Sequence, residues 1–291
     1  MRNRMRGAMA LLLALWCLFS AGCGVDQHVQ TVTGVYLDSI PPYSGSPYVE
    51  INGGEPSFLQ GEMTASSYEI YSPLDALGRC GGASACVGVD LMPTEERGSI
   101  GQVKPTGWQT VKYDCVDGKY LYNRCHLIGY QLSGENANKQ NLITGTRYLN
   151  VEGMLPFENM VADYVKETAN HVLYRVSPLY EGDNLVASGV TMEAKSVEDD
   201  GEGISFYVYV YNVQPGVEID YATGESWLAG TDRPEAAEPE VTYILNISSK
   251  KFHLPTCSGA SSMKAENRQE TSSSREELIS QGYTPCGTCK P

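Results

Sequence analysis

Apolar residues in the middle of the chain recur at two spacings, one typical of a helix and one typical of strands. Helical spacing predicts a helix from Leu155 to Thr168. Strand-like runs follow it. They are Val172 to Val176, Val186 to Glu193 and Ile204 to Val213. Together these elements predict an α+β domain with a mixed or antiparallel sheet.

A second pattern, upstream of the helix, predicts a hairpin. The segments Trp108 to Cys115 and Lys119 to His126 flank Asp117-Gly118, and glycine tolerates the positive φ that a tight turn requires. The hairpin would place His126 at the end of a strand. We therefore expect a hairpin followed by a helix at the centre of the domain.

The N-terminus has the pattern of an export signal. Three arginines precede a continuous apolar run from Ala8 to Phe19, and small residues then lead to Cys23. Small residues directly before a cysteine resemble the lipobox of bacterial lipoproteins, which implies lipidation of Cys23. Ser20 stands where that pattern usually has leucine, so ordinary cleavage and an uncleaved anchor remain alternatives. We expect an exported protein, either attached to the outer face of the cell membrane or secreted.

Composition divides the chain into five segments. Residues 1–22 form the signal peptide and 23–47 a polar tether. Residues 48–223 form one globular domain, long enough for a sizeable core. Residues 224–240 form an acidic linker, and 241–291 a small separate module.

The charge of the chain argues against a tight polyanion-binding protein. There are 21 Lys+Arg and 35 Asp+Glu, and removal of three signal arginines changes the net charge from −14 to −17. Between Lys104 and Arg175, however, eight basic residues nearly balance seven acidic ones. We expect weak, salt-sensitive substrate binding in this region.

The segment from Tyr122 to Tyr130 carries the strongest chemical signal. Asn123-Arg124-Cys125-His126 resembles the Asp-Arg-Gly-His motif of the DNA/RNA non-specific endonucleases, a family of the ββα-metal superfamily that includes secreted and membrane-attached bacterial DNases. The resemblance covers about residues 69–221 and implies a ββα-metal nuclease core.

The resemblance implies roles for five residues. His126 would be the general base, since a neutral imidazole can take a proton from water near neutral pH. Arg124 would hold the phosphate through paired hydrogen bonds. Asn141 would brace the loop, Asn150 would hold Mg²⁺ through its amide oxygen, and Glu158 would act at or near the metal.

Each residue also has a structural alternative. His126 alone could be a satisfied histidine at a strand end, and Asn141 and Asn150 could be turn or cap residues. Glu158 could be a solvated helix residue. Their family-like spacing favours the catalytic interpretation.

Two residues depart from the family motif. Asn123 replaces an acid, and Cys125 replaces a glycine at a position suited to unusual backbone angles or close approach. Export permits disulfides, but four cysteines allow three pairings and the sequence does not choose among them. These cysteines are Cys80, Cys86, Cys115 and Cys125.

The C-terminal module has its own ligand pattern. His253 and Cys257 form one pair, and Cys286 and Cys289 form another. Four such ligands suit tetrahedral Zn²⁺ and leave no open position for catalysis. The pattern resembles the zinc-binding domain of the methyl-phosphotriester DNA-repair protein, which implies a zinc-stapled α/β module. The alternative is a Cys286–Cys289 disulfide with Cys257 free.

These patterns together predict an exported, lipid-anchored, Mg²⁺-dependent endonuclease of low sequence specificity that acts on DNA or RNA. The alternative is a catalytically inactive surface lipoprotein that binds nucleic acid or another partner. A phosphodiesterase for small nucleotides is a third hypothesis, but no base-binding motif supports it.

Overall fold

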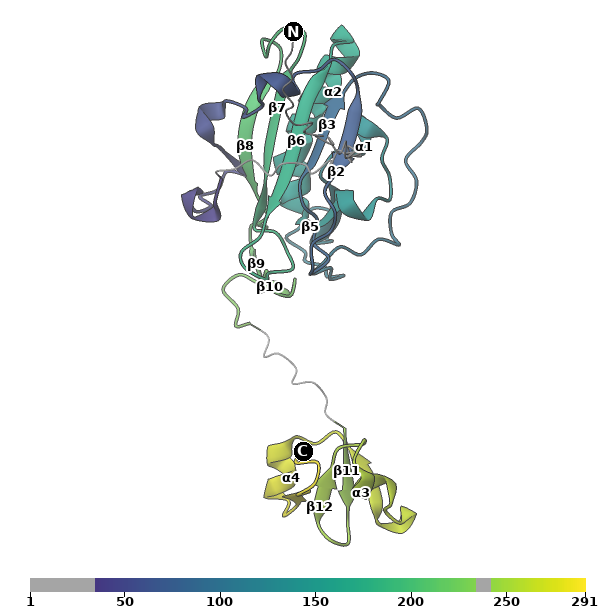
Figure 1. Cartoon of the computed structure of the whole chain (residues 1–291). Coiled ribbons are helices and arrows are strands. Elements are labelled where there is room, and N and C mark those ends of the chain that lie inside the picture. The colour runs from purple at the N-terminus through teal and green to yellow at the C-terminus, as the bar shows by residue number, and fades with distance from the viewer. Residues whose placement is uncertain (1–34, 234–241) are drawn as a thin grey trace, which may run out of the picture. The chain divides into compact units, whose positions relative to one another are not determined.

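The computed structural model describes residues 35–233 and 242–291, and the chain forms two compact units that divide between Glu225 and Ser226 (Figure 1). The predicted signal peptide, residues 23–34 of the predicted tether with Cys23, and residues 234–240 of the predicted linker lie outside the described residues. Within the described ranges, no helix has both the length and the apolar character needed to cross a membrane.

A six-stranded antiparallel sheet forms the framework of the first unit, with strand order β1-β8-β7-β6-β3-β2. Its long central strands confirm the three predicted ones, with ends shifted by a few residues. The six strands are β1 (Tyr48–Glu50), β2 (Tyr68–Tyr71), β3 (Ala83–Val87), β6 (Val172–Leu179), β7 (Gly189–Ser196) and β8 (Ser205–Tyr211).

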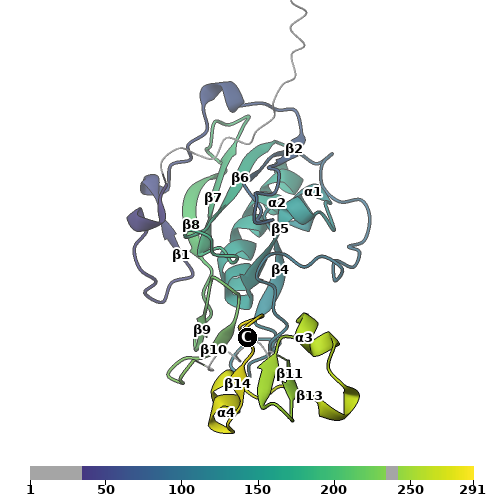
Figure 2. The ribbon, with the colours of Figure 1, turned by 60° about the horizontal axis from the view of Figure 1, so that its bottom comes forward.

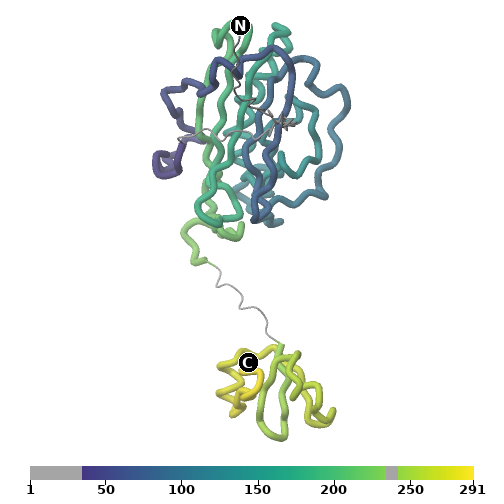
Figure 3. The backbone as a smooth tube through the Cα atoms, in the orientation of Figure 1, coloured from purple at the N-terminus to yellow at the C-terminus, as the bar shows by residue number. Residues whose placement is uncertain are grey.

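The N-terminal part of the described chain lies along one edge of this sheet, next to β8 (Figure 3). Residues 41–47, which we expected in the tether, already contact the domain. The hydroxyl of Tyr211 donates to the carbonyl of Pro41 at 2.6 Å, and the Tyr43 and Tyr211 rings lie 5.6 Å apart. Residues 41–47 thus cover part of an otherwise open sheet edge.

Helix α2 (Leu155–Thr168) has the predicted bounds and packs on one face of the sheet (Figure 2). Val161 and Val165 are fully buried on its apolar side, against sheet residues that include Met192. Burial of each valine contributes about 1.5–3 kcal/mol. The helix ends at Ala169, whose φ of 58° is left-handed. The same core includes residues of β4 and α1, so these elements are held against α2.

The predicted hairpin partner of the His126 strand is wrong. Strand β4 (Tyr122–His126) pairs with β5 (Leu142–Thr146), not with residues 108–115, and His126 faces Leu142 in the register. The Asp117-Gly118 turn is present, but strand pairing there is limited to one bridge, between Lys112 and Tyr120. Every residue of β5 is buried, whereas 108–115 is largely exposed. Apolar burial therefore selects β5 as the partner.

The loop between β4 and β5 contains α1 (Tyr130–Ser133) and a 3₁₀ turn (Lys139–Asn141). A π-helical turn (Leu149–Met154) leads from β5 into α2. Strand β9 (Val217–Ile219) is the last described strand of this unit. The resulting strand, loop, strand and helix give the ββα arrangement, and the mixed α+β fold is confirmed.

The second unit is built around a four-stranded sheet of order β13-β11-β12-β14. Phe252 is fully buried at its centre, and the side chain of Ser274 caps the N-terminus of α4. The elements are β10 (Ser226–Leu228), β11 (Tyr243–Asn246), β12 (Lys251–His253), α3 (Ser258–Ser261), β13 (Arg268–Thr271), α4 (Arg275–Ser280) and β14 (Thr284–Pro285).

Candidate active site

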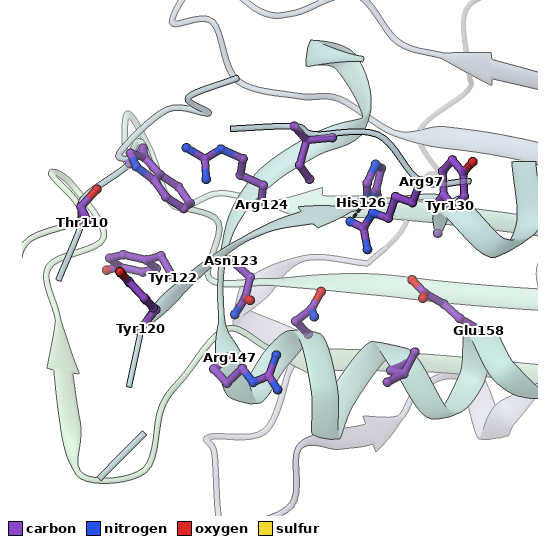
Figure 4. A pocket seen from close by; sticks show the side chains of 15 residues that line it. Arg97, Thr110, Tyr120, Tyr122, Asn123, Arg124, His126, Tyr130, Arg147 and Glu158 are labelled. Carbon is purple, nitrogen blue, oxygen red and sulfur yellow. Dashed lines mark hydrogen bonds between the residues drawn. The ribbon is translucent and has the colours of Figure 1, made fainter. Parts of the chain in front are cut away.

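A cavity of about 630 Å³ lies beside β4 and the start of α2. Figure 4 shows His126, Arg97 and Glu158 at one end of the cavity and Tyr120 and Thr110 at the other. The walls come from the loop before β4, from β4 itself, from the π-helical turn and from the first turn of α2. Segments far apart in the sequence thus supply one concave site.

His126 is the last residue of β4 and is 6% exposed. Its Nε2 lies 2.8 Å from the carbonyl oxygen of Asn136, and because a carbonyl only accepts, Nε2 carries the proton. Nδ1 is then the basic nitrogen of the neutral ring, and it lies 3.4 Å from Nη2 of Arg97. Burial lowers the pKa of His126, the Asn136 contact raises it, and the charge of Arg97 lowers it. The net direction favours a neutral imidazole.

Asn141 fixes the loop that follows His126. Its Oδ1 accepts from the backbone N–H of Ile128 at 2.8 Å, and its Nδ2 donates to the carbonyl of the same residue at 3.0 Å. The backbone N–H of Leu127 donates to the Asn141 carbonyl. Asn141 is fully buried, as are Leu127 and Ile128. It does not line the cavity, so it acts on the site through the loop.

Glu158 lines the cavity from the first turn of α2. Removal from water raises the pKa of its carboxyl to about 7, while the Gln131 amide and the charge of Arg97 act in the opposite direction. The carboxylate packs directly on the backbone of Gly129, where a Cβ would lie 2.7 Å from Oε2. Glycine at 129 therefore leaves the space that the carboxylate occupies.

Three arginines line the cavity, and they are held differently. Arg97 contacts His126, and its charge also acts on Glu158. The sequence gives no sign of this role because the loop that carries Arg97 has no periodic pattern. Arg147 forms an ion pair with Asp117 at 2.8 Å. Arg124, the expected phosphate ligand, donates from Nε to the Val103 carbonyl and from Nη2 to the Gly101 carbonyl at 2.9 Å. These bonds occupy part of its guanidinium.

The oxygen donors of the cavity fit a hard divalent cation. The amides of Asn123 and Asn150 and the carboxylate of Glu158 line the same space. The Asn123 Nδ2 atom is buried without a hydrogen-bond partner, so this donor still needs an acceptor, and only the Oδ1 of the same amide could bind a cation. Asn150 lies in the π-helical turn, a feature often found at functional sites. A site with a small number of protein oxygens in an open cavity suits Mg²⁺, because this ion keeps several of its bound waters.

Cys125 packs into the core rather than into the cavity. It is fully buried within β4, and burial raises the pKa of its thiol. A Cβ built on Gly145 would lie 2.4 Å from the Cys125 Sγ. The side chain that replaces the motif glycine therefore fills the space that Gly145 leaves. All seven cysteines in the described part of the chain are free.

The four predicted zinc ligands come together in the second unit. The ligand atoms of His253, Cys257, Cys286 and Cys289 all lie within 4.8 Å of one another. The Nδ1 atom of His253 is buried without a hydrogen-bond partner. Hydrogen bonds from the backbone N–H groups of Cys289 and Thr288 lower the pKa of the Cys286 thiol to about 7. A compact set of three sulfurs and one nitrogen fits Zn²⁺.

The aromatic end of the cavity carries a signal that sequence reasoning missed. Successive strand residues point to opposite faces, so Tyr122, Arg124 and His126 share one face of β4. All three line the cavity, and Tyr120 extends the row. Alternation from His126 backwards could have identified these tyrosines.

The antiparallel sheet, the ββα arrangement and the histidine at the strand end define the class of metal-dependent endonucleases. Residues 61–198 match the family model described as DNA/RNA non-specific endonuclease.

Solved structures agree with this assignment. NucA from Streptococcus agalactiae with magnesium bound is 27% identical, with 62% of this chain and 85% of that chain covered and a TM-score of 0.55. NucA with no metal bound is 27% identical, with coverages of 66% and 92% and a TM-score of 0.57. The Sda1 nuclease with a bound zinc ion is 26% identical, with coverages of 64% and 97% and a TM-score of 0.54.

Proposed function

We propose that this protein is an exported, Mg²⁺-dependent endonuclease that hydrolyses phosphodiester bonds of DNA or RNA with low sequence specificity. One observation supports it most strongly. The basic nitrogen of His126 lies in the same cavity as Glu158, Asn150 and Arg97. Phosphodiester hydrolysis requires a general base, oxygen ligands for a metal ion and a positively charged side chain for the phosphate, all around one space.

His126 would act as the general base. The Asn136 carbonyl holds the proton on Nε2, which leaves Nδ1 to accept a proton from the attacking water. Its lowered pKa keeps the ring neutral and ready to accept at neutral pH. Asn141 would be a positioning residue, because its two bonds to Ile128 set the loop beside the ring.

The metal would be held by Asn150, with the Asn123 amide and the Glu158 carboxylate near it. A bound Mg²⁺ supplies positive charge that stabilises the phosphate and the leaving oxygen in the transition state. Glu158, with a pKa raised to about 7 in the metal-free site, would ionise more readily beside a cation. Neutral amides around it leave the charge of the ion largely uncompensated.

The phosphate would be bound by arginines. Arg97 faces the base nitrogen and is best placed to contact the phosphate under attack. Arg124, the phosphate ligand suggested by the motif, donates to the carbonyls of Val103 and Gly101. Only its remaining N–H groups could bind a phosphate. Arg147 would contact a neighbouring phosphate.

The remaining sequence predictions form part of the same proposal. Residues 1–22 would direct export, and lipidation of Cys23 would attach the protein to the outer face of the membrane. The domain bounds stay as proposed, with the nuclease at 48–223, the linker at 224–240 and the module at 241–291. Zn²⁺ at His253, Cys257, Cys286 and Cys289 would staple the module, which is too small to be stable on its core alone.

Nicking of covalently closed circular DNA tests this function. The chain from Gly24 onward should nick the plasmid with Mg²⁺, and both EDTA and the His126→Ala substitution should abolish nicking. His171→Ala is a matched control, because His171 pairs with Glu198 and does not line the cavity. Intact plasmid from a folded sample under every condition would favour the inactive, nucleic-acid-binding alternative.

A further inference from the structure

The cavity extends well beyond the residues proposed for hydrolysis. From His126 it follows β4 back to Tyr122, and Tyr120 lies at its far end (Figure 4). Trp108, which packs on Arg124, also lines it. Four residue steps separate Tyr122 from His126, which is roughly 13 Å along a strand. A group bound at the far end is therefore a few nucleotides away from the phosphate under attack.

Tyr120 presents an aromatic surface to solvent at this end. It is 49% exposed, although it is a large side chain next to the fully buried Leu121. The Lys112 Nζ lies 4.4 Å from the centre of its ring. Lys112 thus lies over one face of the ring, where it can attract a phosphate, and the other face is left for a flat apolar group.

The side chains of Trp108 and Arg124 stack on each other on the neighbouring wall of the cavity. The guanidinium carbon of Arg124 lies 4.0 Å from the centre of the Trp108 ring. The bonds from Arg124 to the carbonyls of Val103 and Gly101 fix its plane. The stack is therefore formed before any ligand arrives, and little conformational entropy is lost on binding.

We propose that Trp108, Tyr120, Arg124 and Lys112 form a subsite, the aromatic shelf, that stacks an unpaired nucleobase of the strand being cut. The inference rests on the proposed nuclease function and extends it to substrate form. It assigns Arg124 mainly to positioning Trp108, and it makes Tyr120 the residue that contacts the base.

The aromatic shelf favours single strands for a geometric reason. Every base has a flat face that can stack on an aromatic ring, so binding tolerates any sequence. In a duplex those faces are already covered by neighbouring base pairs. A strand that is single, frayed or looped offers a free face, whereas intact duplex contacts the cavity through its phosphates alone.

A binding cycle tests the aromatic shelf separately from catalysis. The His126→Ala protein from Gly24 onward, in EDTA, is titrated into fluorescein-labelled oligothymidylate, a base-free strand of equal length and charge, and a duplex. Tyr120→Leu in that background should weaken oligothymidylate binding by about 5- to 150-fold, the range of one stacked base. The same substitution should change the affinities for the base-free strand and for the duplex by no more than about twofold.

Two variants serve as matched controls. Tyr120→Trp keeps an aromatic face and should retain oligothymidylate affinity. Tyr36→Leu removes a tyrosine that is 69% exposed and does not line the cavity, and it should change none of the affinities. The inference is overturned if Tyr120→Leu leaves oligothymidylate affinity unchanged, or weakens base-free and base-bearing strands equally.

Plasmid nicking by the unsubstituted protein keeps the two claims distinct. Nicking without a Tyr120 effect on binding would retain the nuclease and reject the aromatic shelf. A Tyr120 effect without nicking would retain the aromatic shelf and reject the nuclease.

Discussion

The substitution of cysteine for the motif glycine gives a prediction about packing that can be worked from distances. In Gly145→Ala, the new Cβ would lie 2.4 Å from the Cys125 Sγ and 2.6 Å from Cδ2 of Leu149, well inside contact distance. The backbone at 145 does not have a positive φ, so the cost is steric. Overpacking of this kind costs about 1–3 kcal/mol.

Cys125→Gly opens the same space from the other side. Loss of two buried heavy atoms and the added chain entropy of glycine in a strand together cost roughly 2–3 kcal/mol. In the double variant the sulfur contact is gone, and only the flexible end of Leu149 must move. We expect the double variant to be at least about 1 kcal/mol more stable than the sum of the single effects predicts.

Urea unfolding followed by Trp108 fluorescence measures this coupling. The protein from Gly24 onward carries Trp227→Phe, so that Trp108 alone reports on the nuclease domain. Val87→Ala, at a buried position in the sheet, should add independently to Gly145→Ala and serves as a control pair. Additive effects for Cys125 and Gly145, within about 0.5 kcal/mol, would refute the idea that the two side-chain volumes compensate.

Further predictions concern the site and the module. Gly129→Ala should displace the Glu158 carboxylate and reduce plasmid nicking by at least about tenfold with little loss of stability, measured by initial rates and thermal unfolding. The pKa of Glu158 is about 7 in the metal-free folded state and ordinary in the unfolded chain, so the folded state binds the carboxyl proton more tightly. The free energy of unfolding in EDTA should therefore fall as pH rises from about 4.5 to 7. Glu158→Gln should remove this pH dependence in urea titrations. The pKa of His126 is lowered, so the nicking rate should rise with pH and reach half its maximum below about pH 6.5. His253→Ala should unfold the second unit while plasmid nicking persists, and loss of both together would contradict separate roles.

Local pattern was sufficient for the helix and the central strands. Helix α2 has the predicted bounds because its apolar spacing and its burial agree. The partner of β4 was mispredicted because a strong turn signal at Asp117-Gly118 is local, whereas burial of β5 depends on the whole core. A turn allows a hairpin but does not supply the apolar contacts that stabilise a sheet.

The candidate site was predictable where a motif carried it. His126, Asn150 and Glu158 line one cavity, and Asn141 hydrogen-bonds to the backbone of Ile128, while their roles stay predictions. Arg97 was not predictable, since nothing in a polar loop indicates that it reaches His126 across the fold. The backbone bonds of Arg124 were also hidden, because they depend on a loop whose path has no periodic pattern.

The general-base role of His126 is the central claim, and chemical rescue tests it most directly. His126→Gly should leave a space in the cavity where added imidazole can accept the proton. The account predicts that His126→Gly is inactive with Mg²⁺ alone, and that imidazole restores nicking in a saturable way that follows the concentration of its unprotonated form. Wild-type rates without imidazole, or no rescue of a folded, DNA-binding variant at any imidazole concentration, would contradict it.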